Sequence, residues 1–178
     1  MAESDIVMAG FGGQGLMAIG KILAKAAMDE GRQVTWMPSY GPEMRGGTAN
    51  CVVIINDDPI GSPVLRRTQA AIVMNKQSID KFEPSVVDAG LIVVNTSLID
   101  RQVRRKDLKA VYVAANELAE REGSARAANM VMLGAYVSAT GVVRTESVEH
   151  AIEATFAGKQ GAAELNIRAF RKGVEAGT

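Results

Sequence analysis

Short apolar runs rich in valine and isoleucine alternate with segments of helical periodicity along most of this chain. Residues 15–30, for example, place Leu16, Ile19 and Leu23 on one helical face between two such runs. Continuous Val/Ile runs are typical of strands that are covered on both faces, as in parallel sheets. We therefore predict an α/β fold, a three-layer sandwich with a mostly parallel sheet. The predicted strands are 5–9, 33–37, 48–56, 70–74, 90–95 and 110–114.

The last third of the chain changes character and predicts extra C-terminal helices. Residues 130–137, Met-Val-Met-Leu-Gly-Ala-Tyr-Val, are apolar all round, which is typical of a helix buried in the core or covered by a partner. A chain of 178 residues is accounted for by one domain, residues 1–178. The predicted helices of this part are 116–122, 127–139, 145–156 and 161–175.

Charge and composition exclude several classes of function. Twenty basic and 20 acidic residues balance, and aromatic residues are scarce, so we expect neither nucleic-acid nor membrane binding. No apolar run reaches the ~20 residues of a membrane helix, and residues 1–5 carry no leader pattern, so we expect a cytoplasmic protein. The single cysteine, Cys51, stands in an apolar strand and is expected to be buried and inert. With one histidine, His150, we predict no metal site and no catalytic residue in this chain alone.

A glycine-rich turn follows the first predicted strand and opens the first helix, as in Rossmann-like folds. Such a turn can hold a phosphate, because glycines let the backbone approach an anion and the helix start offers free N–H groups. The second strand, however, ends Trp36-Met37-Pro38-Ser39, without the acidic residue that binds the ribose of a dinucleotide. Nicotinamide binding, tight packing of strand on helix, and a surface for another ligand or partner all remain open. The residues singled out here are Gly10, Gly12, Gly13, Gln14 and Gly15.

A second glycine-rich loop follows the second predicted strand. Pro42 stiffens it, and Glu43 and Arg45 carry opposite charges, so that Arg45 could grip a phosphate or carboxylate with two hydrogen bonds. Both loops should leave the carboxyl ends of strands, where open α/β sheets place their sites. A solvated turn is the alternative. The candidate residues are Tyr40, Gly41, Pro42, Glu43, Met44, Arg45, Gly46 and Gly47.

These two loops together resemble a known family. Gly10-Phe-Gly-Gly-Gln-Gly-Leu followed by Pro38-Ser-Tyr-Gly-Pro-Glu-Met-Arg-Gly-Gly-Thr-Ala-Asn-Cys51 is similar to the gamma subunit of 2-oxoacid:ferredoxin oxidoreductases. The turn 57–63 and the helix start 129–133 extend the likeness over nearly the whole chain. Among pyruvate, 2-oxoglutarate and ketoisovalerate types, the details most resemble the 2-oxoglutarate type.

The resemblance implies a function that belongs to a complex. Such complexes decarboxylate a 2-oxoacid on thiamine diphosphate with Mg²⁺, pass electrons through iron–sulfur clusters to ferredoxin, and transfer the acyl group to coenzyme A. The alpha and beta subunits, and a delta subunit where the complex has one, would be the partners and would carry the cofactors. The gamma chain would shape the shared site, with Tyr40, Glu43 and Arg45 facing it, and be inactive alone.

Two rival interpretations remain: a stand-alone NAD(P)-binding oxidoreductase and a purely structural scaffold subunit. We also expect an isolated chain to form a homodimer if the apolar helix 130–137 or the loop surface is normally covered.

Overall fold

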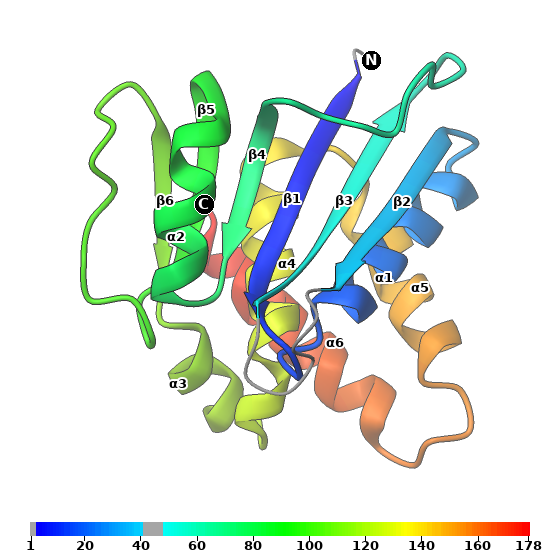
Figure 1. Ribbon diagram of the computed structural model, residues 1–178. Coiled ribbons are helices and arrows are strands. Elements are labelled where there is room, and N and C mark those ends of the chain that lie inside the picture. Colours follow the sequence, from blue (N-terminus) through cyan, green and yellow to red (C-terminus); the bar gives the residue numbers. More distant parts are fainter. Residues whose placement is uncertain (1–2, 41–47) are drawn as a thin grey trace.

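The computed structural model describes residues 3–40 and 48–178, and Figure 1 shows their arrangement. Strands and helices alternate, and most begin and end within two residues of the ranges expected from the apolar pattern. The strands are β1 (Ser4–Phe11), β2 (Gln33–Tyr40), β3 (Thr48–Asn56), β4 (Thr68–Val73), β5 (Val86–Asn95) and β6 (Lys109–Val113). The helices are α1 (Leu16–Asp29), α2 (Lys76–Phe82), α3 (Ala115–Arg121), α4 (Ala128–Thr140), α5 (Thr145–Thr155) and α6 (Ala162–Ala176). Short 3₁₀ turns span Glu83–Ser85 and Ala125–Ala127.

The strands form one mixed sheet in the order β2-β3-β1-β4-β5-β6. The pairs β1–β4, β4–β5 and β5–β6 are parallel, as predicted, whereas β3 runs antiparallel to both β1 and β2. The consecutive strands β2 and β3 are therefore direct antiparallel neighbours in the sheet. The predicted three-layer α/β fold is therefore correct, with one strand reversed.

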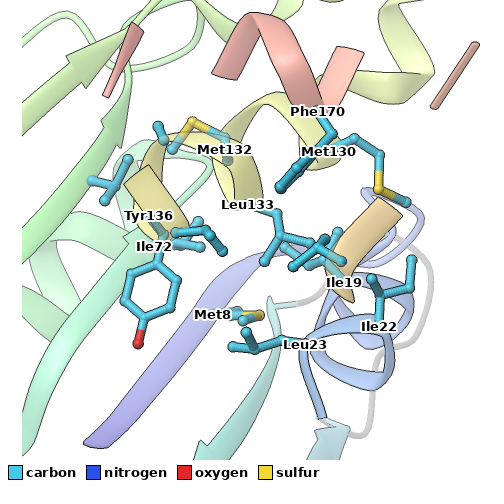
Figure 2. Packing of buried hydrophobic residues seen from close by; sticks show 14 of the residues in the cluster. Met8, Ile19, Ile22, Leu23, Ile72, Met130, Met132, Leu133, Tyr136 and Phe170 are labelled. Carbon is cyan, nitrogen blue, oxygen red and sulfur yellow. The ribbon is translucent and has the colours of Figure 1, made fainter. Parts of the chain in front are cut away.

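Helices cover the two faces of this sheet unequally (Figure 1). Helices α1 and α4 pack on one face, and α2 packs against β1 and β4 on the other. The larger core lies on the α1 face, where Met8 and Ile72 from the sheet meet Leu23 of α1 and Leu133 of α4 (Figure 2). A smaller cluster on the α2 face includes Val7 of β1. Neighbouring residues 7 and 8 thus point to opposite faces, as the alternation of a strand requires.

Helix α4 lies between the sheet and α6, so it is covered on both sides by this chain's own elements. The two helices approach closely at glycines: a Cβ placed on Gly173 would lie 1.9 Å from the carbonyl oxygen of Val131, and one on Gly134 would lie 2.1 Å from that of Phe170. Residues 130–137 are all buried in this way. The apolar helix is therefore covered by α6 of the same chain and offers no surface to a second copy, whereas dimerisation through the loop surface stays a prediction.

Local signals agree with the boundaries of two helices. The Asn75 side chain accepts a hydrogen bond of 2.9 Å from the Ser78 N–H and caps α2. Gly31 follows the end of α1 with a φ of 82°, the left-handed conformation that favours glycine. Among the described helices, α4 included, none combines the length and apolar character needed to span a bilayer.

Candidate functional site at the carboxyl edge of the sheet

The structure brings the anchors of the two glycine-rich loops to one edge of the sheet. Phe11, at the end of β1, pairs with Thr48, and Ala49 pairs with both Gly10 and Tyr40. The second loop thus leaves from Tyr40 and returns at Thr48 directly beside the first loop. The residues between these anchors, Gly41, Pro42, Glu43, Met44, Arg45, Gly46 and Gly47, lie outside the described residues, and their functional role stays a prediction.

The first loop is closed by its own glutamine. The Phe11 N–H donates a 2.6 Å hydrogen bond to Gln14 Oε1, and the Gln14 N–H donates to the Phe11 carbonyl at 3.2 Å. Gly10 makes room for this side chain, because a Cβ there would lie 2.3 Å from Gln14 Oε1. A dinucleotide phosphate would have to displace Gln14 to reach the backbone at this point. The geometry therefore weighs against the dinucleotide interpretation and favours a loop that is fixed internally.

Gly15, at the start of α1, is held from the other side by α4. Its φ is 74°, and its carbonyl accepts a 3.1 Å hydrogen bond from Asn129 Nδ2. A Cβ on Gly15 would lie 2.3 Å from that nitrogen, so the contact requires glycine. Gly13 has a φ of 92° with open space around it, and Gly12 is exposed. The glycines of this loop therefore serve local geometry: close contact at Gly10 and Gly15, and a left-handed backbone at Gly13 and Gly15.

A cavity of about 230 Å³ lies beside this loop. Gly13 and Gln14 line one side, and Asn116, Arg126 and Asn129 line the other. Asn116 Oδ1 accepts a 2.9 Å hydrogen bond from the side-chain amide of Asn95 in β5. Arg126, in contrast, is exposed to solvent. Its described lining carries no carboxylate, imidazole or thiol, so the cavity can position an anionic group but cannot move a proton at neutral pH.

Asn116, Arg126 and Asn129 were not predicted as site residues. A signal for Asn129 does exist in the sequence, because a polar residue there begins an otherwise apolar helix. The other two are recognisable only when α3 and the turn before α4 are placed beside the first loop, as the cavity shows.

Cys51 lies directly under this edge and is chemically protected. It is fully buried, and its thiol donates a 3.4 Å hydrogen bond to the Leu16 carbonyl. Burial raises the pKa of the Cys51 thiol to about 12. A cluster ligand or a nucleophile must be a thiolate, so this residue fits neither role. Within residues 3–40 and 48–178, no group of three or more His, Cys, Asp or Glu side chains is placed to hold a metal ion.

Comparisons with known proteins agree on one family. The family described as "Pyruvate ferredoxin/flavodoxin oxidoreductase" matches residues 5–176. Ketoisovalerate oxidoreductase subunit VorA of Methanothermobacter thermautotrophicus is 40% identical over 175 residues, which are 97% of this chain and 36% of that protein. The 2-oxoglutarate synthase subunit KorC of Methanocaldococcus jannaschii is 33% identical over 176 residues, covering 97% of this chain and 93% of the relative.

The solved structures include a close likeness of the whole chain. The keto/oxoacid ferredoxin oxidoreductase gamma subunit from Geobacter sulfurreducens superposes with a TM-score of 0.88 at 31% identity, covering 99% of this chain and 97% of that one. The chain spans only about a third of the length of the first curated relatives it matches, the two VorA proteins.

Proposed function

Because this chain belongs to the pyruvate ferredoxin/flavodoxin oxidoreductase family, we propose that it is the gamma-type subunit of a 2-oxoacid:ferredoxin oxidoreductase complex. The likeness of the whole chain to a gamma subunit of similar length supports this assignment. The observation that carries it is the shared edge: two glycine-rich loops are anchored side by side, and the described residues around them lack a catalytic set.

The reaction we propose for the complex is the oxidative decarboxylation of a 2-oxoacid to an acyl-CoA, with ferredoxin as electron acceptor. Thiamine diphosphate with Mg²⁺ and the iron–sulfur clusters would be held by the alpha, beta and delta subunits. One buried thiol in this chain cannot hold a cluster, which supports that division. We propose 2-oxoglutarate as the substrate, supported by the KorC relative, whose length is matched almost completely.

The role proposed for this chain is to position the substrate or coenzyme A at the shared site. The first loop is braced by Gln14 and Asn129, which gives the edge a fixed shape. Arg45, on the second loop, would supply a bidentate contact to a phosphate or carboxylate. Such a contact accelerates a reaction by orienting the reacting groups and needs no proton transfer.

Purification of the tagged chain from its native source tests the assignment. We expect alpha- and beta-type subunits to co-purify, together with thiamine, iron and coenzyme A-dependent reduction of ferredoxin. Turnover with 2-oxoglutarate, pyruvate and 3-methyl-2-oxobutanoate then distinguishes the three types of enzyme. Recovery of the chain without any partner that contains thiamine and iron would refute the proposal.

Arg45→Ala tests the role of the second loop, with Arg121→Ala on the exposed end of α3 as the matched control. We expect the Arg45 variant to assemble normally and to lose about 10- to 100-fold in kcat/KM for coenzyme A, the range that one bidentate contact supports. The control should retain its turnover. Normal kinetics in both variants would favour the purely structural scaffold.

A further inference from the structure

The α2 face of the sheet is only half covered by helix (Figure 1). Helix α2 packs against β1 and β4, whereas α1, the helix that packs on β2 and β3, lies on the opposite face. Residues of β2 and β3 that point to the α2 side therefore have no helix packed above them to the extent that β1 and β4 do, within the described part of the chain. Because β3 is antiparallel to β1 and β2, this part of the sheet can leave one face to solvent, so the side chains on that face show whether it is built for a partner.

A groove of about 500 Å³ occupies the uncovered area. Val7, Met37 and Val52, from three adjacent strands, form an apolar floor. Leu65 from the β3–β4 connection and Phe82 at the end of α2 also line the groove. Its apolar lining thus comes from separate parts of the chain that the fold brings together.

The rim of this groove is basic. Arg66, Arg67 and Lys81 line it, and all three are exposed. Arg67 is paired with Asp88 at 2.7 Å, but neither Arg66 nor Lys81 has an ion pair within the described residues. Lys81 Nζ lies 5.1 Å from the centre of the Phe82 ring, which keeps its charge beside the apolar wall. The groove therefore combines apolar surface with two uncompensated positive charges.

We infer that this groove receives a segment of a partner polypeptide that carries acidic side chains beside apolar ones. The basic rim fits carboxylates, and the apolar floor fits side chains inserted between them. In the VorA relative the matched region is only 36% of the protein, so this domain is joined there to further polypeptide that can cover such a surface. We therefore infer that the occupant is a polypeptide. The inference rests on the proposed membership in a complex and names the surface that the complex uses.

Charge reversal at the rim tests the inference in the assembled complex. The variant Arg66→Glu/Lys81→Glu is compared with Arg121→Glu/Lys159→Glu, which changes the charge equally on α3 and beyond α5. Lys159 is a close control, because its Nζ lies 5.7 Å from the Phe156 ring, much as Lys81 lies beside Phe82. All four residues are exposed, so both variants should keep the thermal midpoint of the isolated chain.

We expect the rim variant to raise the Kd for assembly with the partner subunits about tenfold or more, and the control to change it less than about twofold. Lys81→benzoylphenylalanine, irradiated in the complex, should cross-link to a partner peptide that contains Asp or Glu, whereas Lys159→benzoylphenylalanine should not cross-link to that peptide.

Three results would overturn the inference. Assembly could be unchanged in the rim variant, the cross-link could form to a second copy of this chain, or a small organic acid found in the purified protein could prevent the cross-link from forming. Each of them leaves the proposed function intact as long as the wild-type chain co-purifies with its partners. Failure of the wild-type chain to assemble would instead contradict the proposed function itself.

Discussion

Gly15→Ala perturbs a backbone position of the candidate site that only glycine fits without strain. The added methyl group meets two separate obstacles in the structure. The backbone at Gly15 has a φ of 74°, which an L-residue adopts at a free-energy cost of roughly 1–2 kcal/mol. The new Cβ would also lie 2.3 Å from Asn129 Nδ2, far inside van der Waals contact.

The free-energy cost of the clash with Asn129 can be worked out from the hydrogen bonds that this side chain makes. Its Nδ2 donates to the Gly15 carbonyl at 3.1 Å, and its Oδ1 accepts from the Met130 N–H at 2.9 Å. Moving the side chain away sacrifices both bonds, each worth about 1 kcal/mol. Alanine also restricts the unfolded chain, which returns about 0.4–1 kcal/mol. We therefore expect Gly15→Ala to lower the free energy of unfolding by about 2–3.5 kcal/mol.

A double-mutant cycle with Asn129→Ala separates the two contributions. In the Asn129→Ala background the contact is gone, and Gly15→Ala should lower the free energy of unfolding by only about 1 kcal/mol, the backbone part. Urea unfolding of the four proteins, followed by Trp36 fluorescence and far-UV circular dichroism, measures each value. Equal losses in both backgrounds would show that Asn129 does not brace the loop, and the reasoning would be refuted.

Three other buried positions, Gly173, Glu83 and Cys51, can be tested in the same way. Gly173→Ala should lower the free energy of unfolding by about 3 kcal/mol in urea titrations, because its Cβ would lie 1.9 Å from the Val131 carbonyl oxygen and force α4 and α6 apart; a neutral effect would contradict that packing. Burial alone would raise the pKa of Glu83, but hydrogen bonds from backbone N–H groups and from the Arg101 guanidinium lower it below its ordinary 4.5. Because a lowered pKa stabilises the fold above that value, the stability advantage of wild type over Glu83→Gln should be constant above about pH 5 and shrink below pH 4.5, as acid titration followed by circular dichroism would show. Cys51 should resist a thiol-exchange reagent in the native protein at pH 8 and react after unfolding, because burial raises its thiol pKa to about 12; rapid native reaction would place the thiol at the surface.

The secondary structure was largely predictable because it depends on local pattern. The apolar run 48–56 matches β3 from Thr48 to Asn56, and Asn75 caps α2 as a residue of its type should. The burial of Cys51 also followed from its place in an apolar strand. The strand and the cap depend on neighbours within a few residues along the chain, so the sequence pattern carries that information. Cys51 contacts the distant Leu16 carbonyl, but the apolar strand around it already predicts its burial.

The candidate site was predictable in part. The two glycine-rich loops were identified from spacing alone, and the position of strand ends in α/β sheets correctly predicted that both leave the same edge. The bracing of the first loop was not predictable. Gln14 closes it by folding back on Phe11, and Asn129 reaches it from 114 residues away along the chain. No local pattern distinguishes such contacts from an open phosphate cradle.

The sequence thus determined which segments become strands and helices, that the chain has one buried thiol, and which family it belongs to. Only the tertiary structure decided the reversed direction of β3, the burial of α4 beneath α6, and the bare groove beside α2. Propensity and periodicity act over a few residues, whereas strand direction, helix burial and surface shape depend on which distant elements share space. Taken alone, the glycine spacing of the first loop suggests a dinucleotide site. In three dimensions this loop is held by hydrogen bonds to Gln14 and Asn129, and it lies beside the anchors of the second loop.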